Sequence, residues 1–422
     1  FLGCFSGLFF WPRDGQQSKL EFIQASDSAR VAPSPTALML RYWTAGESHG
    51  PALIALIDGF PAGLPIDIPK IDAELVRRQG GYGRGGRQRI ETDSVTFLSG
   101  LWHGVTLGSP LAMQIVNRDA KLERLEEVDR PRPGHADLPG AIKHLGGVRA
   151  VLERASARET AARVAAGALS RQLLSVFGIE VAGWVTELGG LALGDEGFGS
   201  GQPTLPELRA LRDASTIYSL HPERDPEVSA LIDRVGKDGD TLGGIVAVRV
   251  DGLPIGLGTH AQWDRKLDGR LAQAVMAVQA IKGIEIGMGF AAARCRGSEV
   301  HDAIHYSPAE RAGPQLGFTR PTNNAGGLEA GMTNGQPLVI RAAMKPISTL
   351  RKPLESVNLT TKRPEEAAYE RSDVCAVSAA SVIVENVVAF EVAVALIEKF
   401  GGDSVEEMQA RWSLFHDLAR SR

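Results

Sequence analysis

The sequence contains little cysteine. Its 422 residues include 3 cysteines, Cys4, Cys295 and Cys375, which are odd in number and widely separated. A disulfide framework or a zinc or iron–sulfur site needs cysteines in regular or close spacing, so neither is expected, and no metal ligands are predicted. This usage favours a protein that works with reduced thiols in the cytoplasm.

An uninterrupted hydrophobic run is also missing. The longest apolar stretch, residues 376–397, contains Glu385, Asn386 and Glu391. Each carboxylate near the centre of a membrane-spanning helix would cost about 2.5–3.5 kcal/mol, so the stretch predicts a buried core helix and no membrane association. Residues 1–12 are apolar but have no basic region before them, which is not typical of a signal peptide.

An excess of one sign of charge is missing overall, but positive charge is concentrated in one segment. The formal net charge is -4, yet residues 77–89 contain five arginines and five glycines. Guanidinium groups bind phosphate and carboxylate through paired hydrogen bonds, and glycines let the backbone approach a ligand closely. This segment predicts a site for a small, highly anionic ligand; a solvated, flexible basic loop is the alternative.

Two sequence patterns in this segment suggest other functions. Residues 81–86 fit G-x-G-x-x-G, but the dinucleotide fingerprint needs a preceding strand and a following helix. Here a helix-like stretch, 71–79, ends at Gly80, and the strand-like stretch 90–101 follows, so the order is reversed. RNA-binding arginine–glycine tails are repeated and of low complexity, whereas this cluster occurs once. RNA binding therefore remains only an alternative, and no nucleic acid partner is expected.

Residues 46–50 fit G-x-S-x-G, the nucleophile elbow of serine hydrolases. That elbow requires a helix directly after the serine, but Pro51 and a strand-like run follow Ser48. Ser48 is therefore a poor candidate nucleophile. The neighbouring His49 lies at a predicted turn, where its ring can face a ligand; a structural hydrogen-bonding role is the alternative.

The pattern of elements predicts an α+β fold. Strand-like and helical stretches alternate without a fixed βα period, and no linker divides residues 39–422, so a single domain is expected. Residues 1–38 are apolar, then polar and rich in proline and serine, and are interpreted as a disordered or non-native N-terminal extension. The predicted strands cover residues 52–60, 95–101, 111–117, 243–251 and 284–293. The predicted helices cover residues 71–79, 157–177, 225–237, 263–281, 378–400 and 404–419.

Further polar segments have residue types that suit ligand binding. Residues 131–137 place His135 on a proline-rigid turn, and residues 153–160 put arginines at a helix N-terminus, a common phosphate site. The amide- and glycine-rich loop 320–335 suits a flat polar heterocycle, and residues 345–349 add a cation and hydroxyls. Asp373 precedes the last long helix, whose dipole keeps it ionised. The alternatives are helix capping for residues 153–160, a plain surface loop for residues 320–335 and a structural salt bridge for Asp373.

Together these segments closely resemble the chorismate synthase family. The resemblance covers residues 39 to about 400, in order, and rests on residues 41–50, 81–87, 131–137, 155–160, 323–335, 345–349 and 371–373. It implies a sandwich of helices between antiparallel sheets and a homotetramer. It also implies a carbon–oxygen lyase that converts 5-enolpyruvylshikimate 3-phosphate to chorismate by 1,4-elimination of phosphate. This reaction is the last step of the shikimate pathway and needs reduced FMN.

The resemblance also implies residue roles. His49 would protonate the departing phosphate, His135 would protonate or stabilise the reduced flavin, and Asp373 would remove the ring proton together with flavin nitrogen 5. The predicted contacts to substrate or NADP are Arg78, Arg84 and Arg87. The predicted FMN contacts are Ser156, Ala157, Arg158, Gln279, Ala280, Ala330, Lys345, Pro346, Ile347, Ser348, Thr349 and Arg371.

Two departures from the family pattern stand near the predicted flavin site. Ala155 occupies a position where the family commonly has serine, and residues 144–149 are one residue short. The resemblance leaves open whether the protein reduces its own FMN with NADPH or depends on a separate flavin reductase.

Overall fold

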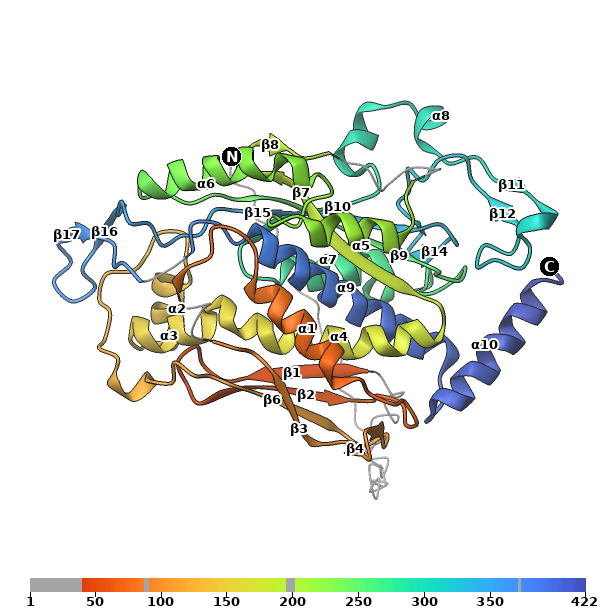
Figure 1. Ribbon diagram of the computed structural model, residues 1–422, viewed down its shortest axis with the longest axis horizontal. Coiled ribbons are helices and arrows are strands. Elements are labelled where there is room, and N and C mark those ends of the chain that lie inside the picture. Colours follow the sequence, from red (N-terminus) through yellow and green to blue (C-terminus); the bar gives the residue numbers. More distant parts are fainter. Residues whose placement is uncertain (1–39, 87–90, 195–201, 371–372) are drawn as a thin grey trace, which may run out of the picture. The chain divides into compact units, whose positions relative to one another are not determined.

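The computed structural model describes residues 40–86, 91–194, 202–370 and 373–422. Leu38–Arg422 form one compact unit. The predicted extension over residues 1–38 lies outside the described residues, so its assignment stays a prediction. The described part of the unit contains two large antiparallel sheets with long helices between them, besides short two-stranded sheets, which confirms the predicted α+β sandwich (Figure 1).

The first sheet contains four antiparallel strands in the order β1-β2-β6-β3. In β6, the buried residues Leu111, Met113 and Ile115 alternate with more exposed ones. Because successive side chains in a strand point to opposite faces, this alternation turns one apolar face of the sheet toward the helices. The strands are β1 (Arg41–Ala45), β2 (Ala52–Asp58), β3 (Val95–Ser99) and β6 (Leu111–Val116).

The second sheet contains five antiparallel strands in the order β10-β15-β9-β7-β8 and is covered on both faces. Helix α9 packs against β7 and β9 on one face, and α5 packs against β7. Trp184 of β7 lies in a separate hydrophobic cluster with Leu205 and Leu208 of α5. The strands are β7 (Glu180–Leu188), β8 (Leu191–Ala192), β9 (Gly244–Asp251), β10 (Ile281–Ile286) and β15 (Leu338–Met344).

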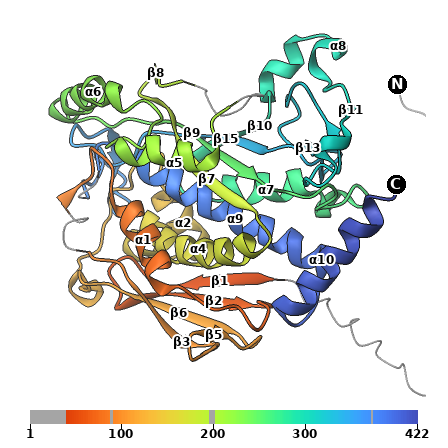
Figure 2. The same ribbon diagram turned by 45° about the vertical axis from the view of Figure 1, so that its right-hand side comes forward.

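Helices α4 (Thr160–Val176) and α9 (Val377–Phe400) form the centre of the layer between the sheets (Figures 1 and 2). Helix α4 packs on β2 and β6, α9 packs on β7 and β9, and the two helices contact each other. Helix α9 is long and apolar enough to cross a membrane, but 94% of its most apolar window is buried inside the protein. It is therefore the core helix that the sequence predicts.

The remaining elements surround this core. Helix α1 (Ile68–Gln79) packs on α4 and α9, and α7 (Leu267–Met276) packs on α9 and β10. The other helices are α2 (Asp137–His144), α3 (Val148–Ala155), α5 (Leu205–Ala214), α6 (Asp225–Lys237), α8 (Gly297–Val300) and α10 (Val405–Ala419). The short strands are β4 (Leu101–Trp102), β5 (Val105–Thr106), β11 (His305–Tyr306), β12 (Phe318–Thr319), β13 (Leu328–Glu329), β14 (Met332–Thr333), β16 (Glu355–Val357) and β17 (Pro364–Glu366).

Gly167 lets α4 and α9 approach closely. A Cβ atom on Gly167 would overlap the backbone carbonyl of Asn386, and both residues are buried within helices. We expect Gly167→Ala to lower the free energy of unfolding by about 3 kcal/mol, the upper end of the usual cost of overpacking a core. Urea denaturation measures this difference.

A helical glycine with room around it is the matched control. A Cβ on Gly269 of α7 would have its nearest neighbour, the carbonyl oxygen of Trp263, at 4.0 Å. Gly269→Ala should be neutral or stabilise by up to about 1 kcal/mol, since alanine favours helix. Equal stabilities of the two variants would contradict the close helix contact.

A buried ionic cluster links α1, α4 and α9. Glu385 of α9 contacts Arg77 and lies 3.0 Å from Nη1 of Arg171, while Glu74 of α1 lies 2.8 Å from the same Arg171 atom. Burial alone would raise the pKa of the Glu74 carboxyl, but the charges of Arg171 and Arg77 and a hydrogen bond from Asn386 lower it from 4.5 to about 2.

This lowered pKa predicts a loss of stability in acid. Because the folded state binds the Glu74 proton more weakly than the unfolded chain, its contribution is fully present above pH 4.5 and disappears as the pH falls through about 2. The full contribution corresponds to about 3 kcal/mol. Urea denaturation should show Glu74→Gln less stable than wild type at neutral pH, with the difference vanishing in acid. A difference independent of pH would contradict the assignment.

Two predicted elements differ from the structure. The helix predicted over 263–281 is α7, which ends at Met276, and the chain turns through Ala280, whose φ is 68°, before β10 begins. The strand predicted over 284–293 ends at Ile286 because Gly287 adopts a positive φ of 57° and a 3-10 helix follows. Apolar residues continue through both boundaries, so periodicity alone does not reveal them.

The other long elements are confirmed, within a few residues at their ends. Helix α1 precedes the arginine–glycine segment and β3 follows it, which excludes the dinucleotide fold. The first turn of the helix predicted over 157–177 is a 3-10 helix, Ala157–Glu159, before α4 begins. After Ser48 the chain enters β2 and not a helix, so the hydrolase elbow is excluded as well.

Candidate active site

A cavity of about 880 Å³ brings most of the predicted site residues together. Its walls come from the β1–β2 loop, the end of α1 and the segment after it, the loop between β6 and α2, the α3–α4 junction, the α7–β10 turn, the segment after β15 and the start of α9. The predicted residues that line it are His49, Arg78, Arg84, His135, Ser156, Ala157, Arg158, Gln279, Ala280, Lys345, Ile347, Ser348, Thr349 and Asp373.

The remaining predicted residues are not among those lining the cavity. Arg87 and Arg371 lie outside the described residues. Ala330 occupies the exposed turn between β13 and β14, with a φ of 51°. Pro346 does not line the cavity, although both of its chain neighbours do. Their assignments stay predictions.

His49 is anchored by one ring nitrogen. Its backbone N–H donates to Oε2 of Glu153 at 2.9 Å, and its Nδ1 lies 3.0 Å from both oxygens of that carboxylate. Its Nε2 lies 3.8 Å from Oδ2 of Asp119. The ring therefore lies between two acids and lines the cavity.

His135 has a similar anchor. Its Nδ1 lies 2.5 Å from Oδ1 of Asp137, a fully buried residue that also accepts from Nε and Nη2 of Arg132 at 2.8 and 3.0 Å. Burial alone would raise the pKa of Asp137, but the hydrogen bonds from His135 and Arg132 hold it well below its usual range. Asp137 is therefore ionised and fixes the orientation of His135.

Asp373 and Arg84 form an ion pair at the cavity. Nη1 of Arg84 lies 2.9 Å from Oδ2 of Asp373, and the backbone N–H of Gly85 donates to Oδ1 at 2.6 Å. The arginine–glycine segment thus folds back onto the residues before α9. Asp373 therefore both forms a salt bridge and lines the cavity.

Arg78 and Arg158 share one buried acid below the cavity. Nη1 of Arg158 donates to Oδ2 of Asp93 at 2.6 Å, and Nη1 of Arg78 lies 3.4 Å from the same atom. Burial lowers the pKa of Arg78 to about 10, with Asp93 opposing the change. Arg78 thus remains a cation at neutral pH, and the Arg158 side chain is directed into this cluster.

The part of the wall formed by the α7–β10 turn and the segment after β15 offers an acceptor and two cations. Gln279 and Ala280 lie in the α7–β10 turn and not, as predicted, within a helix. Among the described residues, the buried Oε1 of Gln279 has no hydrogen-bond partner. The pKa of Lys345 is lowered by burial and by the neighbouring charge of Lys282, which also lines the cavity. This wall therefore suits a ligand with an N–H donor and an anionic group.

The chain is similar in sequence to known proteins over nearly its whole length. The family model for chorismate synthase matches residues 40–397. The chorismate synthase of Geobacter metallireducens is 54% identical over 397 residues, covering 91% of this chain and 100% of that protein. The chorismate synthase of Brevibacillus brevis is 51% identical over 385 residues, covering 88% and 97%. The chain belongs to the chorismate synthase family.

The fold comparison agrees with this membership. A solved structure described as a crystal structure of chorismate synthase superposes with a TM-score of 0.75 and 41% identity, and the match covers 91% of this chain and 99% of that one. The sandwich of helices and antiparallel sheets is therefore the fold of the chorismate synthase family, as the resemblance implies. The two departures, Ala155 and residues 144–149, lie at the end of α3 and at the α2–α3 junction, and Ala155 lines the cavity.

Several charged residues at the cavity were missed by sequence reasoning. The resemblance gave no role to Glu153, Asp137 or Arg132. Asp137 and Arg132 lie in residues 131–137, on which it rests, and Glu153 lies two positions before residues 155–160. Asp119 and Lys121, which form an ion pair at 3.0 Å, gave no signal because they follow a strand in an ordinary polar loop. Pairing each predicted catalytic histidine with the nearest acid in its own motif would have found Asp137 for His135. It would not have found Glu153, which is 104 positions from His49.

Proposed function

We propose that this protein is a chorismate synthase, which eliminates phosphate and a ring proton from 5-enolpyruvylshikimate 3-phosphate. The observation that carries this proposal is a single cavity lined by both histidines, Asp373 and two of the three predicted arginines, in a chain that matches its relatives over nearly their whole length. The substrate carries two carboxylates and a phosphate, roughly four negative charges at neutral pH. Cations that line the cavity and suit it are Arg78, Arg84, Lys121, Arg132, Lys282 and Lys345.

The residues present fit FMN as the cofactor. Gln279 supplies a buried acceptor for a ring N–H, the Lys345 and Lys282 charges favour an anionic phosphate, and Ser348 and Thr349 add hydroxyls. Apolar groups from Met276, Val278, Ile281, Met344 and Ile383 line the same cavity and suit a flat ring system. When bound, reduced FMN supplies electron density transiently to the substrate ring, and the reaction has no net redox change.

The chain's own residues supply the proton chemistry and the positioning. His49 donates a proton from Nε2 to the departing phosphate, and Asp373 accepts the proton lost from the ring. His135, fixed by Asp137, supplies a second proton-exchanging group on the cofactor side of the site. Arg84 holds Asp373 in place before substrate arrives and offers its charge to the substrate carboxylates.

The RNA-binding alternative has no support in the comparisons. The described arginines of the arginine–glycine segment turn inward, since Nε of Arg78 donates to Thr160 at 3.0 Å and Arg84 pairs with Asp373. We further propose a homotetramer that works in the cytoplasm. A separate flavin reductase and reduction by NADPH remain the two sources of reduced FMN.

An anaerobic assay tests the proposal. Purified protein, 5-enolpyruvylshikimate 3-phosphate and dithionite-reduced FMN should yield chorismate absorbance and released phosphate in equal amounts, and oxidised FMN should yield neither. A folded, flavin-binding protein that forms no chorismate would refute the proposal. Repeating the assay with NADPH and oxidised FMN, without dithionite, distinguishes an enzyme that reduces its own flavin from one that needs a reductase.

A further inference from the structure

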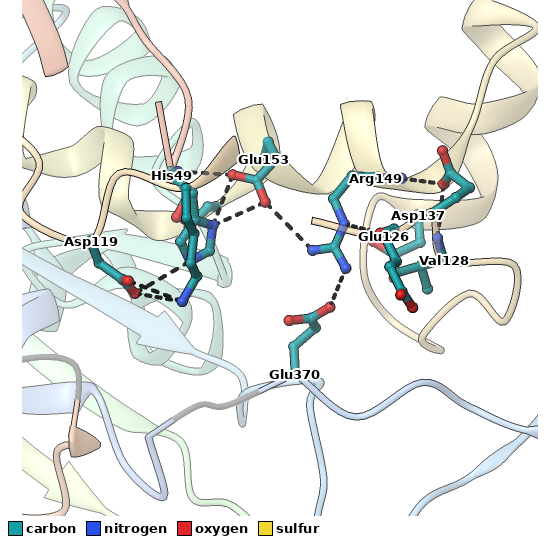
Figure 3. A network of polar contacts seen from close by, with 12 residues as sticks. His49, Asp119, Glu126, Val128, Asp137, Arg149, Glu153 and Glu370 are labelled. Carbon is teal, nitrogen blue, oxygen red and sulfur yellow. Dashed lines mark hydrogen bonds and ion pairs between the residues drawn. The ribbon is translucent and has the colours of Figure 1, made fainter. Parts of the chain in front are cut away.

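Glu153 of α3 contacts the segment around His49 through both its side chain and its backbone. Its carboxylate receives the backbone N–H of His49 and lies 3.0 Å from Nδ1 through both oxygens, and its backbone carbonyl accepts the N–H of Ser48 at 3.0 Å. The Glu153 side chain is 1% exposed. Figure 3 shows Glu153 between His49 and Arg149, with Asp119 on the far side of the imidazole.

The charge of this carboxylate follows from its neighbours. Burial alone would raise the pKa of Glu153, but the hydrogen bonds and charge of His49 and the charge of Arg149 outweigh burial and lower it. An ionised carboxylate only accepts hydrogen bonds. The hydrogen between Glu153 and His49 must therefore lie on Nδ1, which leaves Nε2 as the nitrogen that gains and loses a proton.

We infer that Glu153 is the positioning residue for His49: it keeps hydrogen on Nδ1 and aims Nε2 at the cavity. The charged groups that face this pair come from two segments, α3 and the loop after β6. Arg149, one turn earlier on α3, lies 3.5 Å from Oε1 of Glu153. Asp119 lies 3.8 Å from Nε2 of His49, and Lys121 pairs with Asp119.

Arg149 restrains the carboxylate in this position. Its Nη2 donates to Oε1 of Glu370 at 3.0 Å, and its Nε donates to the carbonyl of Glu126 at 2.8 Å. With its guanidinium held from two other segments, Arg149 keeps the Glu153 carboxylate from rotating away from His49. The positioning therefore depends on side chains from α3 and from the segment after β17, and on a backbone carbonyl from the loop before α2 (Figure 3).

This inference rests on the proposed function for its catalytic consequence. If His49 delivers a proton from Nε2 to the departing phosphate, a ring that turns or changes tautomer delivers it poorly. Glutamine at position 153 can either accept from or donate to Nδ1, so both tautomers become available. Acids that orient metal-bound histidines typically affect activity by about 10- to 100-fold, and we expect a loss of similar size here, since fixing the tautomer of a catalytic histidine is a known role of a buried acid.

The test combines kinetics with direct observation of the imidazole. Glu153→Gln should lower kcat by about 10- to 100-fold, with KM for 5-enolpyruvylshikimate 3-phosphate and FMN binding near wild type. Glu153→Asp, which keeps the acceptor, should recover part of the lost turnover. The matched control is Glu127→Gln, since Glu127 accepts from the backbone N–H of Arg149 at 2.8 Å and none of its hydrogen bonds among the described residues goes to His49. That control should keep wild-type kcat.

The tautomer is read by ¹⁵N NMR of histidine-labelled protein at alkaline pH, with the His49 signal assigned by its loss in His49→Ala. Wild-type His49 should carry hydrogen on Nδ1, and Glu153→Gln should show a mixture. Hydrogen on Nε2 in the wild type, or wild-type kcat in Glu153→Gln, would overturn the inference. Should Glu153→Gln fail to fold, the wild-type tautomer still decides. A wild type that makes no chorismate would instead refute the proposed function, and the NMR result would stand independently.

Discussion

His49→Ala should lower turnover by about 10²- to 10⁴-fold, the usual contribution of one positioned general acid. The imidazole lines the cavity with Nε2 directed away from its anchor on Glu153, so alanine removes the proton donor and leaves the cavity walls in place. FMN should still bind, because the residues that suit it come from the α7–β10 turn and the segment after β15. Anaerobic steady-state kinetics and flavin fluorescence titration measure the two quantities separately.

The control for this experiment is a histidine away from the cavity. His260 is exposed in the loop before α7 and does not line the cavity. His260→Ala should therefore keep wild-type turnover. Near-normal turnover in His49→Ala would remove this residue from the acid role, and loss of FMN binding would show that its role is structural.

Asp373→Asn should also abolish most turnover, by about 10²- to 10⁴-fold, while both ligands still bind. Asparagine has nearly the same shape as aspartate and can still accept from the N–H of Gly85, but it cannot take up the ring proton. The variant also weakens the ion pair with Arg84, whose Nη1 lies 2.9 Å from Oδ2 of Asp373. Single-turnover assays with reduced FMN would show normal binding followed by slow or absent product formation.

A variant of a second acid that contacts the arginine–glycine segment distinguishes a catalytic role of Asp373 from a structural one. Asp233 of α6 accepts from the hydroxyl of Tyr82 at 3.0 Å and does not line the cavity. Asp233→Asn should keep full activity. If Asp373→Asn unfolds the protein or loses both ligands, the ion pair is structural, and the base must be sought elsewhere.

The sequence predicted those helices and strands that have a recognisable local pattern of residue types. The apolar length of α9, the alanine-rich run of α4 and the alternation in β6 each identify the element without help from distant residues. The end of α7 could not be predicted in this way. The chain turns there through Ala280 at a positive φ, a conformation that glycine usually marks, and the Ala280 carbonyl accepts from the distant backbone N–H of Lys345 at 2.9 Å.

The sequence predicted many of the residues that line the cavity, but not the residues that hold them in place. The motifs around His49, His135 and Asp373 are local, so a resemblance transfers them position by position. The partner of His49 comes from α3, 104 positions later, and only folding brings the two together. Arg158 shows the opposite limit: its place at the cavity was predicted, but its side chain is committed to Asp93.

The contact between α4 and α9 has a consequence for the evolution of the site. Both helices begin at the cavity, since Thr160 of α4 and Ala379 and Ala380 of α9 line it. The spacing of these two helices, set where Gly167 meets Asn386, therefore also affects the distance between the cavity residues that the two helices carry. A substitution at this buried position would alter how tightly substrate is enclosed without changing any residue that touches it. Selection on the shape of the cavity can therefore act on a residue in the core.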